Sequence, residues 1–279
     1  MFIIFFFSFA IFQQCQASDL TFRDANSWSK EYPQCGTKYQ SPIAINTESL
    51  IPQVYDSPLI SYHENEQANT YTFYNTGTGL MLVSEWPEGR IPYLSGGPLG
   101  EDKYFYDSTW FRWNQDGQDE NGHIFDGESF PLFAHLHYYN EKYGSLEEAS
   151  NYPDGLVAVA AKWAISNEST SPAFSGMIRR LPEVTEPGSQ VEIRPLRVSD
   201  TRNRPDDDPK VMFYYFGSQV TPPCAPVEWF LPDYVHYLTL DELAVFRSIK
   251  LNNSDDHNTR PVQPLNDREV YKTNKYVRE

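Results

Sequence analysis

The sequence of 279 residues predicts a mainly β protein with a single domain. Most of its patterned segments are short and alternate apolar with polar side chains, which is typical of strands that bury one face. Helical patterns are few, and the 21 prolines interrupt the chain often. No internal repeat, linker or shift in composition divides the sequence. A content of 40% apolar residues is enough to build one large core.

Alternating segments mark the expected strands in chain order. They are TYTFYN at 70–75, GLMLVSEW at 79–86, TWFRWN at 109–114, LFAHLHYYN at 132–140 and KVMFYYFG at 210–217. The segment GLVAVAAKWAI at 155–165 is continuously apolar, as expected of a strand that is buried on both faces. The clearest helix is TLDELAVFRSI at 239–249, where Thr239 can cap the first turn and Glu242 follows three residues later.

The first seventeen residues, MFIIFFFSFAIFQQCQA, have the pattern of a secretory signal peptide. They hold about eleven apolar side chains, too few to span a membrane, and end at the small residue Ala17. We therefore assign 1–17 to a signal peptide and 18–279 to the mature domain, with an N-terminal core strand as the alternative for 1–17. No later segment is long and apolar enough to cross a bilayer, and the polar tail YKTNKYVRE fits no GPI signal. We expect a secreted, extracellular protein.

The net charge is strongly negative, because 22 basic residues stand against 38 acidic ones and give −16. This balance argues against nucleic acid and anionic lipid as partners. It favours cations or basic proteins, or serves solubility alone. Acidic runs DDD at 206–208 and SDD at 254–256 could bind calcium loosely, although such runs are more often solvated loops.

Cys35 and Cys224 remain after Cys15 leaves with the signal peptide. In an oxidising compartment they could pair, closing a loop worth on the order of 5 kcal/mol by chain entropy. Two free buried thiols are the alternative. Asn167 and Asn252 begin glycosylation sequons, which gain weight because the chain is expected to be secreted.

Six segments together resemble the α-carbonic anhydrase family, in the family's order and over nearly the whole mature chain. They are WSKEYPQCGTKYQSPIAI at 28–45, GGPLG at 96–100, HLHYYNEKYGSLEEASNYPDGLVAV at 135–159, GSQVTPPCAPVEW at 217–229, LAVFRSI at 243–249 and RPVQPLNDREV at 260–270. The resemblance implies a large, twisted, mostly antiparallel sheet with a few short peripheral helices and a cone-shaped cavity on one side. Secreted members join the cysteines of two of these segments, which implies a Cys35–Cys224 disulfide here.

The family's chemistry depends on a zinc ion held by three histidines, which lowers the pKa of bound water to about 7. Two of these histidines come from one strand as His-x-His and the third from the neighbouring strand. Position by position, the third matches His135, while the first two match Trp110 and Arg112. The resemblance thus implies zinc as cofactor and, at the same time, the loss of two of its ligands.

The residues that would support a zinc-bound hydroxide differ as well. Phe133 stands where an acidic residue normally orients the third histidine, and it cannot accept a hydrogen bond. Val220, followed by Thr221, replaces the hydroxyl that accepts from the hydroxide. The carboxylate partner of that hydroxyl falls on Gly122, with Glu120 two residues away. The proton-relay histidine matches Thr78.

Arg112 opposes a metal rather than merely failing to bind it. Its guanidinium stays charged, offers only donors and places a positive charge where a cation would sit. Trp110 is expected to fill the volume that zinc and water need. These substitutions predict no catalytic residues, no cofactor and no metal site beyond the remnant ligand position His135.

The remaining histidines carry weaker signals. His135 and His137 share a strand face and could form an altered metal site; the favoured interpretation is a core His135 and a packed or pocket-lining His137, because two imidazoles beside a fixed cation make a poor cage. His123 matches a structural histidine of the family and is expected in a buried polar network. Outside any cluster, and expected at the solvated surface, are His63, His236 and His257.

The sequence is therefore identified as a secreted, catalytically silent carbonic anhydrase-like protein that acts as an extracellular binding or structural module. Its partner would be an extracellular protein or a small anionic ligand, the latter suggested by Arg112. One alternative is an active or residual enzyme, a carbonate dehydratase-type lyase or an esterase, with an altered metal site. The other is an acidic matrix or mineral-associated protein that binds calcium.

Overall fold

The structure is a computed structural model that describes residues 20–116, 120–167, 170–197, 211–273 and 276–278. The predicted signal peptide at 1–17 and the acidic run at 206–208 lie outside these ranges. None of the helices within them is long and apolar enough to cross a membrane.

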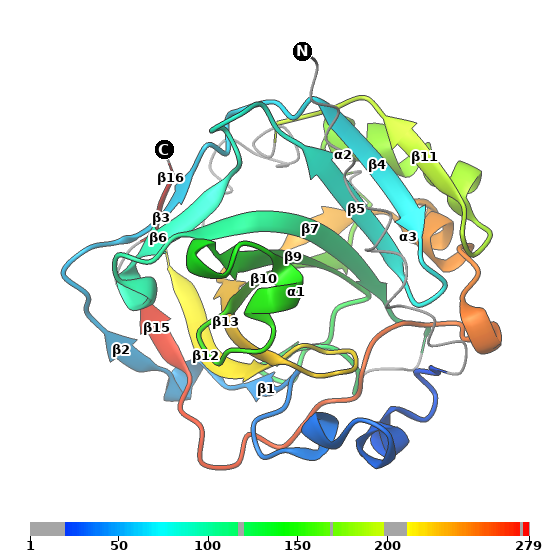
Figure 1. The fold of residues 1–279 in the computed structure, drawn as a ribbon. Coiled ribbons are helices and arrows are strands. Elements are labelled where there is room, and N and C mark those ends of the chain that lie inside the picture. The colour runs from blue at the N-terminus through cyan, green and yellow to red at the C-terminus, as the bar shows by residue number, and fades with distance from the viewer. Residues whose placement is uncertain (1–19, 117–119, 168–169, 198–210, 274–275, 279) are drawn as a thin grey trace.

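One curled sheet of 14 strands dominates the molecule (Figure 1). Its main path runs β11 (Gln190–Ile193), β4 (Thr70–Asn75), β5 (Leu80–Glu85), β7 (Tyr104–Trp113), β9 (Leu132–Asn140), β10 (Leu156–Ile165), β13 (Pro226–Pro232), β12 (Met212–Ser218), β15 (Tyr271–Thr273) and β2 (Ile51–Gln53). Off this path lie β14 (His236–Leu238) beside β10, β6 (Tyr93–Gly96) beside β7, β3 (Leu59–Tyr62) beside β6 and β16 (Tyr276–Arg278) beside β3. A separate parallel pair joins β1 (Ala44–Ile45) to β8 (Ile124–Phe125).

The sheet is mostly antiparallel, as expected. The parallel pairs within it are β10 with β13 and with β14, β15 with β2, and β16 with β3. All six predicted strand segments are confirmed, and β7 begins earlier than predicted, at Tyr104, with a bulge between Tyr106 and Ser108. The sequence missed this start because the bulge breaks the period of two that the prediction used.

The helices are short. The α-helices are α1 (Leu146–Ala149), α2 (Pro172–Ile178) and α3 (Leu240–Arg247). The 3₁₀ turns are η2 (Ala25–Lys30), η3 (Pro33–Gly36), η4 (Thr47–Ser49), η5 (Gly97–Leu99), η6 (Glu141–Tyr143), η7 (Leu181–Val184) and η9 (Asn252–Ser254). In α3, Thr239 and Glu242 form the predicted capping box.

The central strands β7, β9 and β10 present two faces with different residues. The pairs Trp110–His135, Arg112–Phe133 and Ala160–His135 are directly opposite one another, so these residues share one face, here called the histidine face. The alternate residues, which include Phe111, Ala134, Leu136, Ala161 and Trp163, form the opposite face. Helices α2 and α3 cover the latter, where the ring of Phe111 lies 6.1 Å from that of Phe174 and 5.5 Å from that of Phe246.

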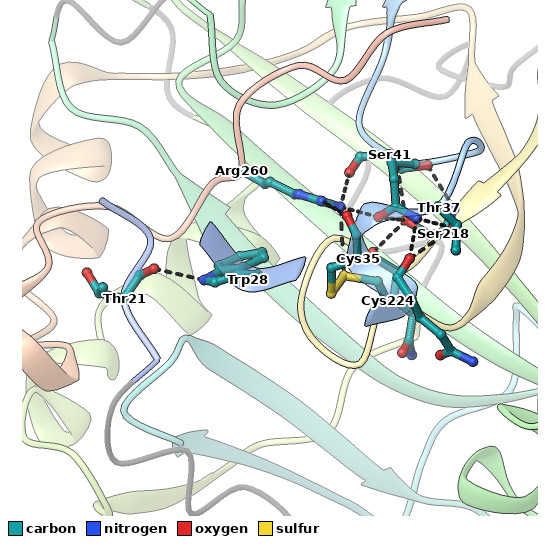
Figure 2. The surroundings of a disulfide bond; sticks show 11 residues. Thr21, Trp28, Cys35, Thr37, Ser41, Ser218, Cys224 and Arg260 are labelled. Carbon is teal, nitrogen blue, oxygen red and sulfur yellow. Dashed lines mark hydrogen bonds between the residues drawn. A yellow bond between two sulfur atoms is a disulfide. The ribbon is translucent and has the colours of Figure 1, made fainter. Parts of the chain in front are cut away.

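The disulfide between Cys35 and Cys224 is present, with Cα atoms 5.0 Å apart, which confirms the pairing that the resemblance implied. Figure 2 shows buried Arg260 beside it. The guanidinium donates from Nη1 to Gln40 Oε1 (2.8 Å) and from Nη2 to the Cys35 carbonyl (3.0 Å). These bonds tie the N-terminal segment to the C-terminal one, so the scaffold implied by the motifs at both ends is in place.

Candidate functional site

The positions singled out by the resemblance come together on the histidine face. Trp110 and Arg112 project from β7, and Phe133 and His135 project from the paired positions of β9. The period of two places them on one side of the sheet because both strands are regular at this point. The structure thus brings together the residues that the resemblance implied, although the sequence could not predict how each side chain is packed.

Arg112 is buried, with only 3% of the residue exposed. Its Nη1 donates to the carbonyl oxygen of Thr78 at 3.2 Å, and its Cζ lies 5.1 Å from the Trp110 ring and 5.8 Å from the Phe22 ring. A Cβ atom at Gly79 would come within 3.1 Å of Nη1, so the glycine leaves room for the guanidinium. The charge is held between aromatic faces, which favour a cation when water is excluded.

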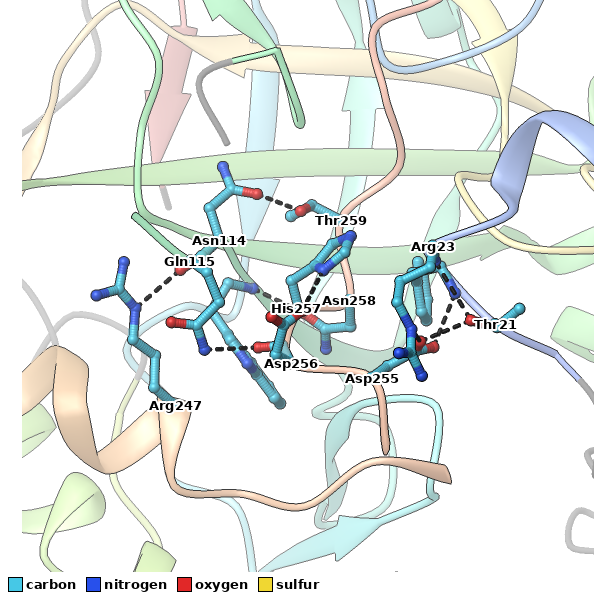
Figure 3. A network of polar contacts seen from close by, with 12 residues as sticks. Thr21, Arg23, Asn114, Gln115, Arg247, Asp255, Asp256, His257, Asn258 and Thr259 are labelled. Atoms are coloured by element: carbon cyan, nitrogen blue, oxygen red, sulfur yellow. Dashed lines mark hydrogen bonds and ion pairs between the residues drawn. The ribbon is translucent and has the colours of Figure 1, made fainter. Parts of the chain in front are cut away.

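Phe22 reaches Arg112 because the segment that carries it is tied down by Asp255. The carboxylate accepts from Thr21 Oγ1 (2.6 Å), the Phe22 backbone N–H (2.8 Å) and Arg23 Nε (3.0 Å) (Figure 3). No sequence signal pointed to this contact. It also bears on the acidic run at 254–256, since both carboxylate oxygens of Asp255 are already bonded within the protein.

A second tie runs along the end of β7 (Figure 3). The Asn258 side chain accepts from the Trp113 N–H at 2.8 Å and donates to the Phe111 carbonyl at 2.9 Å. The main chain on both sides of Arg112 is therefore fixed by one asparagine.

His135 is the matched third ligand position, and it is buried with 4% exposed. Among the described residues, neither of its ring nitrogens has a hydrogen-bond partner. Its ring lies 4.9 Å from that of Trp229 and 6.1 Å from that of Phe133. Burial above all, then nearby His123 and the Arg112 guanidinium, hold its pKa well below the ordinary value, so the ring is neutral.

His123 and His137 are neutral for the same reason. Burial lowers the pKa of His123 to about 3, and burial with the charge of Arg112 lowers that of His137 to about 3. His123 Nε2 lies 2.7 Å from the Tyr215 hydroxyl, which confirms the expected buried polar contact. His137 is half-buried on the histidine face, which is compatible with the packed or pocket-lining position expected for it.

Phe133 and Gly122 fit one another. Phe133 is fully buried, and a Cβ atom placed on Gly122 would lie 2.6 Å from its Cε2 atom. The glycine also has φ of 80°, a conformation that side chains rarely adopt. The ring thus takes the space above position 122, where the family would have a carboxylate. Glu120, the suggested substitute, is exposed at the surface.

The rest of the matched shell is apolar or engaged elsewhere. Val220 is buried in the same hydrophobic cluster as Phe133 and Trp229, and Thr221 is half-buried. Thr78, at the relay position, is buried and lies 3.2 Å (Oγ1 to Oγ1) from Thr76.

Zinc does not fit the donors present on the histidine face. The matched positions offer an indole, a guanidinium and one imidazole, and a guanidinium has no lone pair for a metal. Within the described residues, no group of three or more His, Cys, Asp or Glu side chains is placed to hold a metal ion.

The expectation that three further histidines lie at the solvated surface is wrong. His236 and His257 are buried, and His63 is half-buried with Nδ1 3.2 Å from the Ile91 carbonyl. His236 stacks on Trp163 at 4.7 Å, and His257 Nδ1 lies 2.7 Å from Asp256 Oδ1. The prediction failed because an imidazole can pack against other aromatic rings in a core. Those rings come from distant parts of the chain, so the local sequence does not reveal them.

Two ionisable groups near this face, whose pKa burial shifts, escaped the sequence analysis. Lys162 is a charged residue within the apolar segment of β10, and its Nζ donates to the carbonyls of Pro232 (2.6 Å) and Tyr234 (2.9 Å). Burial lowers its pKa to about 8. Asp107 occupies the β7 bulge, where burial raises its pKa. The sequence could have revealed Lys162, because it is a lysine inside an apolar segment. It could not have revealed the burial of Asp107, because that depends on the bulge in β7.

The two predicted sequons differ in surroundings. Asn167 is exposed, and the two residues after it lie outside the described ranges. Asn252 is half-buried against Gly77, whose Cβ position would come within 2.4 Å of the Asn252 amide nitrogen.

Comparison with known proteins gives one consistent result. The family model described as eukaryotic-type carbonic anhydrase matches residues 23–274. The chain is 27% identical over 261 residues to carbonic anhydrase 6 of Bos taurus and 28% identical over 253 residues to that of Mus musculus, covering 88% of this chain and 76% of each relative. It is 28% identical over 261 residues to carbonic anhydrase 6 of Homo sapiens, covering 88% of this chain and 79% of the relative.

Proposed function

Because the chain belongs to the eukaryotic-type carbonic anhydrase family while its matched ligand positions carry Trp110 and Arg112, we propose that it is a zinc-free member without carbon dioxide hydration activity. It acts in the extracellular space as a binding or structural module built on the family scaffold. The observation that carries this proposal is the packing of the histidine face. A buried guanidinium and the Phe133 ring occupy the surroundings in which a metal and its hydroxide would have to be held.

The substitutions support one another physically. A positive charge at Arg112 repels a divalent cation, and it also disfavours protonation of His135 and His137. Phe133 gives His135 no acceptor to orient its ring, and its position above Gly122 excludes a carboxylate there. Each change removes a different requirement of the chemistry, so no single replacement restores it.

An extracellular location is part of the proposal. The Cys35–Cys224 disulfide supports it, since such bonds persist in oxidising compartments. The signal-like pattern of residues 1–17 points the same way.

The direct test measures zinc and turnover on the same sample. The mature chain is purified, equilibrated with zinc and dialysed, then analysed for metal content and for carbon dioxide hydration by stopped flow. We expect far less than one zinc per chain and a rate equal to buffer. Stoichiometric zinc together with hydration above buffer would overturn the proposal.

A double variant, Trp110→His with Arg112→His, sharpens this test. We expect it to gain little turnover, because Phe133 and Val220 still leave any metal poorly oriented and any hydroxide without an acceptor. The single variant Trp110→His serves as control, since it keeps the Arg112 charge. Turnover of the double variant near that of an active family member would contradict this expectation.

One observation favours a second candidate, a residual activity at an altered site. The two ring nitrogens of His135 have no hydrogen-bond partner among the described residues, which leaves them open to a ligand. Ester hydrolysis is assayed with the wild type and with His135→Ala and His137→Ala. Loss of a measurable rate in either variant supports the second candidate, and equal rates in all three dismiss it.

A further inference from the structure

A cavity of about 140 Å³ lies on the opposite face of the central strands, away from His135. Thr109 and Phe111 of β7, Ala134 and Leu136 of β9, and Ala161 and Trp163 of β10 line it. These are the alternate residues to Trp110, Arg112 and His135, so the sheet itself separates the cavity from the site described above. The inference drawn from it is independent of the proposed function.

Aromatic rings form much of the cavity wall. Tyr71, Trp86, Tyr106 and Tyr138 follow one another edge to face, with centroids 6.3, 6.3 and 5.7 Å apart. Trp86 is only half-buried, which gives this wall a side toward solvent. Aromatic rings around a small volume can offer their π faces to a cation that has left water behind.

A buried carboxylate completes the wall. Glu64 lines the cavity with 7% of the residue exposed, in the turn that follows β3. The Tyr276 hydroxyl, from β16, donates to its Oε1 at 3.0 Å. Because β16 pairs with β3, the strand pairing brings Tyr276 to this turn. A carboxylate that is kept among aromatic rings binds a positively charged group more strongly than an exposed one does.

We propose that this cavity binds a small organic ammonium ion, with the ring faces around its apolar part and the Glu64 carboxylate on its charged nitrogen. The size fits, since a cavity of about 150 Å³ in another protein accepts benzene. The net charge of −16 favours a cation over an anion in the same position.

The test compares two probes of nearly equal shape, benzylammonium and benzyl alcohol, by calorimetry at pH 7 on the full mature chain. We expect benzylammonium to bind at least about tenfold more tightly, a typical gain for a cation placed among ring faces and a carboxylate. Equal affinities, a preference for the alcohol, or no binding of either probe at millimolar concentration would overturn the proposal.

Variants assign the preference to Glu64. In Glu64→Gln the two probes should bind with about equal affinity, because the negative charge is lost. Benzyl alcohol should still bind, because the shape of the cavity is kept. The matched control is Glu66→Gln, two residues away, where an exposed carboxylate pairs with Arg90 instead; it should keep the tenfold preference. A preference that survives Glu64→Gln would contradict the assignment.

A third variant keeps the test informative if Glu64→Gln does not fold. Ala161→Leu adds volume inside the cavity and should weaken both probes by at least about tenfold, since the added carbons take the space of the ring. Unchanged binding of benzylammonium in this variant would place its site elsewhere and overturn the proposal.

Discussion

The histidine face and the opposite face of β7, β9 and β10 are made from alternate residues of the same three strands, yet they are packed differently. On the histidine face, Phe133 fills the space over Gly122 and Arg112 lies between Trp110 and Phe22. On the opposite face, a cavity of about 140 Å³ remains between aromatic walls. In this chain the histidine face is closely packed around Phe133 and Arg112, while free volume is found behind it.

The two faces also bury ionisable groups of opposite kinds. The histidine face holds the neutral imidazoles of His135 and His137, and the ring centroid of buried His123 lies 6.2 Å from that of His135. The opposite face holds Glu228, which lies directly across from Val157 of β10 and whose pKa burial raises to about 7. Each group resists its charged form, so the two faces respond to acid in opposite ways.

The largest expected effect is therefore the pH dependence of stability, to which His123, His135 and His137 all contribute. A buried histidine with a lowered folded pKa binds a proton only in the unfolded chain, so each one costs about 1.4 kcal/mol of unfolding free energy per pH unit as the pH falls below about 6.5. For Glu228 the folded pKa is the higher one, so its contribution is full below about 4.5 and is lost as the pH rises toward about 7. In urea unfolding between pH 6.5 and 5, His137→Gln should flatten the decline of stability with acid, and Glu228→Gln should steepen it.

Both variants are compared with the wild type at each pH, and the slopes are the readout. If the slope of stability against pH in His137→Gln equals that of the wild type, the imidazole of His137 is not neutral in the folded protein. The same slope in Glu228→Gln as in the wild type would contradict a raised pKa of Glu228 in the folded protein.

The next effect concerns the fit of Phe133 against Gly122. Gly122→Ala should lower the unfolding free energy by about 3 kcal/mol, from overlap with the ring and from backbone strain. Gly127→Ala is the matched control, because Gly127 has φ of 84° and nothing within 4 Å of its Cβ position; it should cost only about 1 kcal/mol. In a Phe133→Ala background the cost of Gly122→Ala should fall to that of the control, and an unchanged cost would mean that the ring is not the obstacle.

The smallest effect uses neighbouring alanines of β10 that point to different faces. Ala160→Val adds two methyl-sized groups to the filled histidine face and should cost about 1–3 kcal/mol. Ala161→Val adds the same groups to the cavity and should be neutral or stabilising by up to about 1 kcal/mol. Thermal unfolding of the two variants measures the difference directly, and equal costs would show that the two faces are packed alike.

Local patterns were enough to predict most of the fold. The period of two in 70–75 and 132–140 matches β4 and β9 residue for residue, and Thr239 with Glu242 marks the start of α3. The motifs around Cys35 and Cys224 implied the disulfide that the structure contains. These features depend on neighbours in sequence or on a resemblance that covers the whole chain, so no knowledge of packing was required.

The sequence, through its family resemblance, also implied which side chains meet on the histidine face, and the strand pairing places Trp110 and Arg112 beside Phe133 and His135. Only the tertiary structure decided what those side chains do. Phe22 covers Arg112 through bonds to Asp255, more than 230 residues away, and His236 is buried against Trp163 rather than solvated. The cavity beside Glu64 depends on Tyr276 at the other end of the chain. The burial of a side chain and the volume of a cavity depend on contacts between segments that are distant in the chain, so local sequence patterns cannot predict them.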